Sequence, residues 1–452
     1  MTEIKYESLE DVLDRAKQAE GQFFSSIATT NRIDNLKNKG ALGQIIEEDW
    51  FGYSINSNRE ADFAAFDTEL KVTPIKKLKN GNYSAKERLV LSIINYMEDY
   101  KEEFTNSSFL KKSQKLLLMF YLWEPQIVDN NYQLIKTYLL QFSETDLQII
   151  ENDWTIIMDK IKAGKAHELT EADTFYLAAC TKGSSAQNSL REQPFSNILA
   201  KQRAYSMKTS YMTTLVRKII NDETFESLYQ VDSPKTLEDL LFEKLSPFFM
   251  LNVEEIKKRL NLEIKNTTKN FIQILISKIL GISGTDLNKI SEFNKANIKI
   301  KTIRLLANGT PKEHMSFPTF KFMEIVNESW EESRLYKIFS TQKFLFIIFQ
   351  FDCNNKLVFK GFKLWNMPYT ILENEIKNTW LETVSVIKNG VILEKKNGRI
   401  YNNFPTASFN NVCHVRPHAQ NAADTYPLPD GRLLTKQCFW LDKKFIKQII
   451  SE

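Results

Sequence analysis

Short sequence matches recur in the two halves of this 452-residue chain, always in the same order and about 230 residues apart. The run Ser8–Leu13 returns as Thr236–Leu241, and the apolar run Leu116–Phe120 returns as Phe344–Ile348. Self-similarity at a fixed spacing is the signature of a repeated structural unit, so the pattern predicts one domain fold that is used twice. The remaining collinear matches pair Trp154 with Trp380, Cys180 with Cys413, and Lys201-Gln202 with Lys436-Gln437.

The length of the chain agrees with two domains, because 452 residues exceed what one hydrophobic core usually organises. The seam is expected in Asn221–Lys235, a polar stretch that contains Ser233-Pro234. Thr236 is a plausible N-cap for the helix that follows, with acidic residues in its first turn. We therefore expect domains at residues 1–222 and 236–452.

The composition, with 42% apolar and 26% charged residues, is that of a soluble globular protein. The four cysteines form no CxxC pair and are too few for a disulfide framework, which favours a reducing, cytoplasmic setting. The acidic N-terminus is unlike a signal peptide, and the longest apolar runs are too short to cross a bilayer, so no membrane association is expected. A net charge of +4 is by itself no argument for nucleic-acid binding.

The first half alternates between two kinds of apolar spacing. Period-3.6 patterns predict helices, and denser or alternating apolar runs predict buried strands. The mixture predicts an α/β domain with a mixed central sheet flanked by helices. The predicted helices are Leu9–Ala19, Leu42–Trp50 and Gln148–Lys162, and the predicted strands are Phe63–Pro74, Leu89–Tyr96 and Leu116–Trp123.

A short acidic and basic motif lies in the first predicted strand. Successive residues of a strand point to opposite faces, so Glu69 and Lys71 should share a face while Leu70 enters the core. Asp62 lies just upstream, close enough for a turn to bring it beside them. Two carboxylates and the Leu70 carbonyl would supply the hard oxygen ligands that Mg²⁺ prefers. Such an ion activates water and offsets charge on a phosphate, and Lys71 would position or deprotonate the water.

The motif is short enough to arise by chance. The alternative interpretation is a salt-bridged strand on the protein surface, and Glu47 has a similar alternative as a solvated residue on an amphipathic helix. A second kind of observation is needed to choose between them.

Longer stretches of the sequence resemble a known family. Residues 39–47, Asp62-Phe63 and 69–74 resemble the MutH mismatch-repair nickase. The match is closer to the Sau-type type II restriction endonucleases that cut GATC, and it extends into the second half. The stretches that carry this second resemblance are 73–81, 86–91, Cys180-Thr181-Lys182-Gly183, 201–204 and His414-Val415-Arg416-Pro417-His418.

The resemblance implies roles for particular residues. Asp62, Glu69 and Lys71 match the metal-binding and catalytic positions, and Glu47 matches a helix glutamate that joins them. Glu48 is the alternative to Glu47, because the spacing is one residue longer than usual. A further lysine near the scissile phosphate falls on Lys112, with Lys115 as its rival.

The family reads DNA with a loop and a later aromatic residue. Here these correspond to the loop 181–185, which contains Thr181, Lys182 and Gly183, and to Tyr205. The nickase has an arginine at the position of Thr181, so guanine must be contacted differently, and Lys182 or Arg203 could donate to guanine O6 and N7. Alternatively, these loop residues form an ordinary solvated turn.

The second half lacks the acidic motif. Aligning the repeats puts Glu292 opposite Asp62, Lys299 opposite Glu69 and Lys301 opposite Lys71. A lysine in place of the metal-binding glutamate would repel Mg²⁺, so this half should not cut. The resemblance implies a DNA-binding effector domain instead, and a purely structural domain is the alternative. The residues retained for DNA are Arg416, His418 and Lys436.

A metal site in the second half was weighed and disfavoured. Cys413, His414 and His418 lie close in sequence, but no fourth ligand is evident, and Cys413 matches Cys180 as a small buried residue.

The sequence therefore predicts a type II restriction endonuclease that uses Mg²⁺ to cut double-stranded DNA at GATC, before the guanine as the resemblance implies. One active site for a palindromic target predicts transient dimerisation on DNA or sequential nicking, with a second DNA copy on the C-terminal half. A companion DNA methyltransferase is implied functionally. The alternatives are a mismatch-repair nickase and a DNA-binding regulator without catalysis.

Overall fold

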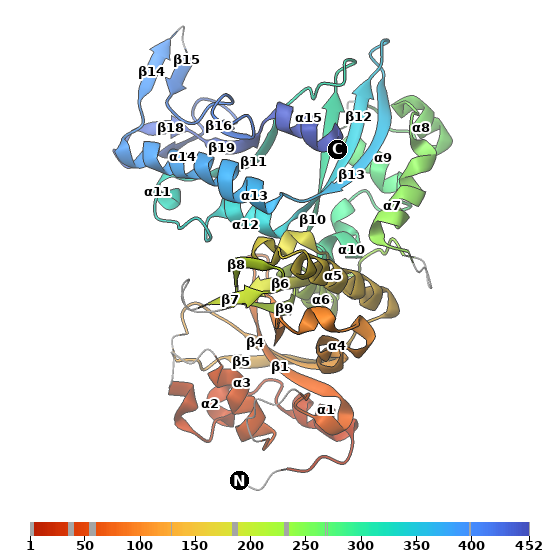
Figure 1. The fold of residues 1–452 in the computed structure, drawn as a ribbon, viewed down its shortest axis with the longest axis vertical. Helices are drawn as coiled ribbons and strands as arrows, with labels where there is room; N and C mark the ends of the chain where they lie inside the picture. Colours follow the sequence, from red (N-terminus) through yellow and green to blue (C-terminus); the bar gives the residue numbers. More distant parts are fainter. Residues whose placement is uncertain are drawn as a thin grey trace. The chain divides into compact units, whose positions relative to one another are not determined.

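The computed structural model describes residues 4–34, 40–53, 60–127, 129–182, 189–229, 235–266, 268, 270–396 and 399–451 (Figure 1). The chain divides into two compact units. Unit 1 comprises Met1–Leu237 and Asn288–Asn297, and unit 2 comprises Glu238–Leu287 and Ile298–Glu452. No helix in the described ranges combines the length and the apolar character that a bilayer crossing requires.

Unit 1 contains two main sheets. One has the strand order β2-β1-β4-β5, with β1 and β4 parallel and the other pairs antiparallel, and the other has the order β3-β9-β6. The strands are β1 (Thr68–Lys77), β2 (Tyr83–Ala85), β3 (Leu89–Ile93), β4 (Lys115–Leu122), β5 (Gln133–Gln141), β6 (Leu177–Thr181), β7 (Leu190–Gln193), β8 (Ser196–Lys201) and β9 (Arg203–Met207). The helices include α1 (Leu9–Gln18), α2 (Phe24–Ile27), α3 (Ala41–Gln44), the π-helix η2 (Ile45–Trp50), α4 (Ser108–Ser113), α5 (Glu144–Lys162), α6 (Thr209–Ile219) and α10 (Ser291–Lys295).

Local sequence explains the main elements of unit 1. Ser8 caps α1 by accepting from the Asp11 amide while the Asp11 carboxylate accepts from the Ser8 amide, a reciprocal capping box. The run Leu116–Phe120 is buried throughout, as expected for a strand covered on both faces. These strands fix the position of the residues predicted to be catalytic.

Unit 2 repeats the same kinds of element. Its sheets have the orders β10-β12-β13 and β11-β19-β16. The strands are β10 (Ile298–Leu305), β11 (Met315–Phe320), β12 (Lys343–Phe351), β13 (Leu357–Trp365), β14 (Leu393–Lys396), β15 (Arg399–Asn402), β16 (Cys413–Pro417), β17 (Thr425–Pro427), β18 (Leu433–Thr435) and β19 (Gln437–Leu441). The helices include α7 (Leu237–Leu245), α8 (Val253–Arg259), α9 (Phe271–Ile279), α11 (Phe322–Ile325), α12 (Arg334–Thr341), α13 (Tyr369–Ile371), the π-helix η10 (Leu372–Ile376), α14 (Lys377–Asn389) and α15 (Lys443–Ser451).

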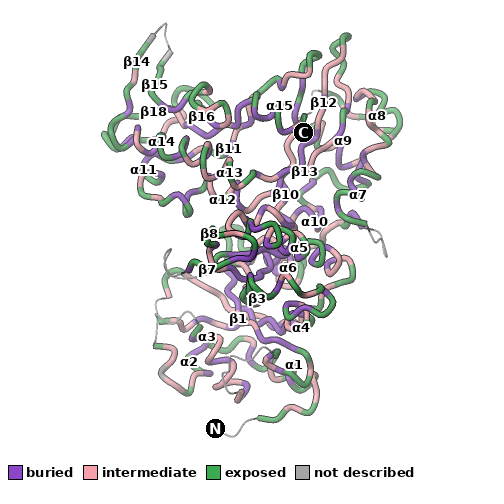
Figure 2. Tube along the Cα trace, viewed as in Figure 1, coloured by how far each residue is buried: buried purple, intermediate pink, exposed green. Residues whose placement is uncertain are grey.

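The two units share their strand connectivity. In both, a parallel pair is extended by an antiparallel strand, as β1-β4-β5 in unit 1 and β10-β12-β13 in unit 2. Each also has an antiparallel three-stranded sheet whose last strand in sequence lies in the middle. Figure 2 shows the buried stretches of the trace concentrated along these strands. Both units are thus mixed α/β structures.

Three local predictions need correction. The strand predicted over Phe63–Pro74 begins only at Thr68, because the 3₁₀ helix η3 (Ala64–Phe66) and a left-handed Asp67 precede it. The helix predicted over Leu42–Trp50 is α-helical only at its start and continues as η2. Cys180 and Cys413 are not at equivalent rungs, since Cys180 is the fourth residue of β6 and Cys413 the first of β16.

One segment departs from the domain ranges expected from sequence. Residues 288–297 belong to unit 1, where the Lys295 ammonium pairs with Asp146 at 2.7 Å and the Ser210 hydroxyl donates to the Lys295 carbonyl at 2.7 Å. The helix α7 begins directly after Thr236, as expected, while residues 230–234 of the predicted seam lie outside the described residues.

Candidate active site

A turn before β1 brings Asp62 to the strand. The Phe63 amide donates to the Thr68 carbonyl at 2.9 Å, which folds residues 62–67 back along the start of the strand. One carboxylate oxygen of Asp62 then accepts from the Leu70 amide at 2.9 Å. The N–H and C=O of one strand residue point to the same edge, so the Leu70 carbonyl faces the side of Asp62. Asp62, Glu69 and the Leu70 backbone are brought together, as the sequence motif predicts.

Glu69 is buried, with 3% of its surface exposed. Its Oε1 accepts from the Lys71 ammonium at 2.5 Å and lies 3.5 Å from the Lys112 ammonium. Its Oε2 is buried without a hydrogen-bond partner among the described residues. Burial raises the pKa of the Glu69 carboxyl, and Asp62 raises it further, while Lys71 and Lys112 oppose the shift. A buried carboxylate oxygen left without a partner is costly unless a ligand satisfies it.

The structure distinguishes Lys112 from its rival. Ser107 caps α4 and directs the last turn of this short helix, which carries Lys112, toward Glu69. Lys115 opens β4 instead, and its ammonium donates to the Phe66 carbonyl at 3.3 Å. Lys112 is therefore the lysine that faces the carboxylate.

The structure also distinguishes Glu47 from Glu48. In η2 the Phe51 amide bonds to the Ile46 carbonyl at 3.0 Å, five residues back, so the turn holds one residue more than an α-helix. Glu48 pairs with Arg32, whereas burial first and then Asp62 raise the pKa of the Glu47 carboxyl. Arg32, which no sequence motif indicates, is what separates the two glutamates.

The residues predicted to read DNA in unit 1 fall into two groups. Thr181 and Lys182 are exposed at the end of β6, and Gly183 lies outside the described residues. Arg203 is buried, and its guanidinium donates to the Ala179 carbonyl at 2.7 Å. Tyr205 is 1% exposed, and its hydroxyl donates to Asp99 at 3.1 Å. The side chains of Arg203 and Tyr205 therefore do not reach the surface, because they satisfy the core of unit 1.

The residues predicted to contact DNA in unit 2 lie together on neighbouring strands. Arg416 lies over the Trp440 ring, 5.7 Å from its centroid, and the His418 ring is 5.4 Å from the same ring. The Lys436 ammonium pairs with Asp424 at 2.5 Å and lies over the Tyr426 ring. Arg416 and His418 are exposed, and Lys436 is half-buried.

The start of β1 forms one corner of unit 1, and the start of β10 forms the corresponding corner of unit 2. The strand registers relate these two corners. Glu69 and Lys71 pair with Leu116 and Leu118 of β4, and Lys299 and Lys301 pair with Phe344 and Phe346 of β12. Because β4 and β12 open at the matched lysines Lys115 and Lys343, Lys299 occupies the rung of Glu69 and Lys301 that of Lys71. The register reproduces the alignment of the repeats.

Glu292, which the alignment of the repeats puts opposite Asp62, does not supply a carboxylate at the β10 corner. That side chain accepts from the Ser227 hydroxyl at 2.6 Å and the Leu228 amide at 3.1 Å, all within unit 1. Burial lowers the pKa of both Lys299 and Lys301, and the Lys301 ammonium lies 3.4 Å from the Ser316 carbonyl.

Comparison with known proteins agrees with this geometry. The sequence model of the family described as "MutH: DNA mismatch repair enzyme MutH" matches residues 51–153, which include Asp62, Glu69, Lys71 and Lys112. The DNA mismatch repair proteins MutH of Shewanella sp. strain W3-18-1 and Shewanella baltica strain OS195 are 27% and 25% identical, and each alignment covers 48% of this chain and 97% of the relative. Residues 51–153 thus match a MutH-like domain.

A second relative extends over both halves. The type II restriction enzyme Sau3AI of Staphylococcus aureus is 37% identical, and the alignment covers 99% of each chain. The chain belongs to the MutH-like, Sau-type family of type II restriction endonucleases. Endonucleases of this type generally depend on divalent metal ions.

Proposed function

We propose that this chain hydrolyses a phosphodiester bond in each strand of double-stranded DNA at GATC, before the guanine, with Mg²⁺ as its cofactor. The observation that carries the proposal is the buried, unpartnered Oε2 of Glu69 beside Asp62 and two lysines. A salt-bridged surface strand, the alternative interpretation of the motif, would leave Glu69 in solvent, whereas 3% of its surface is exposed. The 37% identity to a type II restriction enzyme supports the reaction class.

The donor set fits Mg²⁺. Asp62, Glu69 and the Leu70 carbonyl supply oxygen atoms only, and Mg²⁺ binds few protein oxygens while it keeps several waters. The oxygen of Glu69 that lacks a partner is the atom that most needs a cation. When bound, the ion lowers the pKa of a coordinated water and offsets charge on the phosphate.

Each remaining residue has a distinct task in the proposed reaction. The Lys71 ammonium, held at 2.5 Å from Glu69, positions the attacking water opposite the leaving oxygen. Lys112 stabilises charge that grows on the phosphate, as a preorganised cation in a partly buried site does. Glu47, whose carboxyl pKa is raised, orients water at the same corner.

We infer that the chain arose by duplication and carries a catalytic domain at 1–222 and a DNA-binding effector domain at 236–452. The matched strand orders and the matched rungs of β1 and β10 support two MutH-like domains. The lysines at the rungs of Glu69 and Lys71 support a second domain that does not cut.

The proposed DNA contacts leave out Arg203 and Tyr205, whose side chains are buried. The proposed contacts in the first domain are Thr181, Lys182 and Gly183, and those in the second domain are Arg416, His418 and Lys436. A single active site on a palindromic target requires transient dimerisation on DNA or sequential nicking, with a second GATC copy bound by the effector domain. A companion methyltransferase would protect the host DNA.

Digestion of GATC plasmids tests the proposal. An unmethylated plasmid with Mg²⁺ should be linearised at GATC and then fragmented, and EDTA should abolish cutting. Adenine- and cytosine-methylated plasmids then define the methylation sensitivity. Intact unmethylated plasmid in the presence of Mg²⁺ would contradict the proposal.

The same assay separates the alternative functions. A mismatch-repair nickase would leave nicked circles unless a repair partner were added, whereas we expect linear DNA from the purified chain. A DNA-binding regulator would retard DNA without cutting it. Asp62→Ala should bind DNA as the wild type does and fail to cut, so full cutting by this variant would show that the site is assigned incorrectly.

A further inference from the structure

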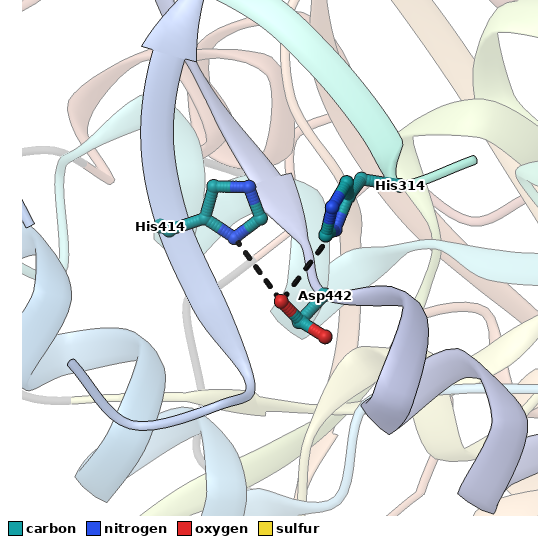
Figure 3. A group of neighbouring side chains, drawn as sticks. All are labelled: His314, His414 and Asp442. Carbon is teal, nitrogen blue, oxygen red and sulfur yellow. Dashed lines mark ion pairs between the residues drawn. The ribbon is translucent and has the colours of Figure 1, made fainter. Parts of the chain in front are cut away.

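Three residues that are distant in sequence meet at one end of the sheet β11-β19-β16 in unit 2 (Figure 3). Met315 of β11 and Cys413 of β16 both pair with Leu441 of β19. His314 therefore lies opposite Asp442, and His414 is diagonal to it. Because alternate residues of a strand share a face, all three side chains project from the same side of the sheet.

The geometry is close to that of a coordinated ion. The Nδ1 atoms of His314 and His414 lie 3.5 and 3.8 Å from one oxygen, Oδ2, of Asp442. Tetrahedral ligands at about 2.0 Å from zinc are about 3.3 Å apart, so shifts of a few tenths of an ångström would complete the site. In the part of the chain that the structure describes, this is the only trio of His, Cys, Asp or Glu whose ligand atoms all lie within 4.8 Å of one another.

The ring nitrogens of His414 lack hydrogen-bond partners among the described residues. His414 is 1% exposed, and both of its ring nitrogens are buried without a hydrogen bond to any described residue. A neutral imidazole carries one donor and one acceptor, and buried polar atoms are rarely left unmatched.

The other two residues are held in place for the same ligand. Asp442 Oδ1 accepts from the Lys444 amide at 2.7 Å at the start of α15, while Oδ2 faces the two rings. The Lys443 amide donates to His314 Nδ1 at 3.1 Å, so this nitrogen carries a lone pair rather than a proton, and an ion bound at Nδ1 would take the place of that amide. His314 also lines a cavity of about 750 Å³.

We propose that His314, His414 and Asp442 bind a divalent transition-metal ion of the zinc type, with a fourth position left for a further ligand. Two imidazoles and one carboxylate select zinc-like ions over Mg²⁺, which prefers oxygen ligands alone. Arg416 acts on both histidines and Lys443 acts on His314, and both cations weaken the attraction for a dication, while the Asp442 carboxylate offsets them. The bound ion would link β11, β16 and the start of α15.

This site replaces the trio of Cys413, His414 and His418 weighed from the sequence. Cys413 points to the opposite face of β16 from His414, and burial raises the pKa of its thiol to about 12. His418 is exposed against Trp440. No sequence spacing could indicate His314 or Asp442, because only the sheet register brings them to His414.

Zinc retention by the full-length chain tests the site. The protein is dialysed against zinc and then against a zinc-free buffer that contains Mg²⁺, and bound zinc is measured by elemental analysis. We expect one zinc ion per wild-type chain, and none in His314→Gln, His414→Gln or Asp442→Asn. His418→Ala, a histidine four residues along the same segment, is the matched control and should keep its zinc. Glu69→Gln, which disables the proposed Mg²⁺ site, should keep it as well.

Thermal unfolding guards against a variant that fails to fold. Zinc should raise the melting temperature of the wild type by about 3 °C or more, and that of Asp442→Asn not at all. Without zinc the two proteins should melt cooperatively with similar circular dichroism. Absence of zinc from the wild type, its retention by all three site variants, or its loss from Glu69→Gln would each overturn the proposal.

Discussion

The corner at β1 and the corner at β10 have the same strand register and opposite charge. At β1, Glu69 and Asp62 present carboxylates that two lysines approach, and at β10 the same rungs carry Lys299 and Lys301. The sheet is kept in both places, since Leu116–Phe120 and Phe344–Ile348 maintain the parallel pair beneath each corner. The comparison teaches that the scaffold and the chemistry are set by different residues. The apolar residues of β4 and β12 are kept, whereas the polar residues of the paired strands β1 and β10 differ.

The same comparison separates two uses of basic residues. In unit 1 the lysines lie against a buried carboxylate, where their charge is matched. In unit 2 Lys301 is partly buried beside a carbonyl and an aromatic ring, and burial lowers its pKa. Arg416 and His418 remain exposed there. Unit 2, which carries lysines at the rungs of Glu69 and Lys71, thus has cations at its surface, as the proposed DNA-binding domain requires.

The largest expected effect comes from replacing Glu69, the proposed acidic metal ligand of β1, whose equivalent on β10 is Lys299. Glu69→Gln should lower the cleavage rate by about 1,000-fold or more, because several kcal/mol of transition-state stabilisation depend on the ion it holds. Cleavage of a labelled GATC duplex under single-turnover conditions measures the rate, and gel retardation should show unchanged DNA affinity.

The matched control is the equivalent rung in unit 2. Lys299→Gln should change the cleavage rate constant by less than about threefold, because Lys299 touches no reacting atom in the proposed mechanism. A loss comparable to that of Glu69→Gln would show that the two corners do not differ in the way their charges indicate.

A smaller effect is expected from the second lysine at the β1 corner. Lys112→Ala should slow cleavage about 100-fold, the scale for removing one preorganised group that stabilises charge in the transition state. Lys115→Ala should change the rate less than about threefold, because its ammonium bonds to the Phe66 carbonyl. Single-turnover rates of both variants at saturating Mg²⁺ compare them directly, and equal losses would remove the distinction between the two lysines.

The DNA contacts of unit 2 should have a still smaller effect. Arg416→Ala should weaken DNA binding about fivefold at moderate salt and lower the slope of log affinity against log salt by about one unit. Fluorescence anisotropy without metal measures binding in the absence of cutting. Arg304→Ala is the control, because Arg304 is exposed on the same unit but pairs with Glu313 at 2.5 Å. An unchanged salt slope in Arg416→Ala would show that this surface does not contact phosphate.

Much of this comparison could be predicted from the sequence. The collinear matches predict two units with corresponding strands, and the spacing of Asp62, Glu69 and Lys71 predicts that Asp62 lies beside Glu69 and Leu70, as it does in the structure. Local patterns could not show that Glu48 pairs with Arg32, which favours Glu47 for the proposed site, because that pair joins residues distant in sequence. They also could not foresee that Arg203 and Tyr205 satisfy the core, or that residues 288–297 join unit 1, since both depend on tertiary packing.

The smallest expected effect concerns the stability of unit 2. Burial lowers the pKa of Lys301 below its usual 10.5, so the folded state disfavours the charged form relative to the unfolded chain. Below the lowered pKa both states are protonated and the full penalty applies. As the pH rises toward 10.5, the unfolded chain holds more protons than the folded one, and the wild type gains stability. Lys301→Met should therefore be more stable than the wild type by ~1 kcal/mol at pH 7, with a difference that shrinks as the pH approaches the usual lysine range.

Urea unfolding at pH 7 and pH 9 measures this difference, with Arg304→Met as the control on the same strand. Arg304 is exposed and paired with Glu313, so its replacement should change the unfolding free energy by less than about 0.5 kcal/mol at either pH. A Lys301→Met variant that is less stable than the wild type at pH 7 would mean that the Ser316 carbonyl and the Phe317 ring more than offset the loss of hydration. The Lys301 cation would then contribute to the stability of unit 2 instead of reducing it.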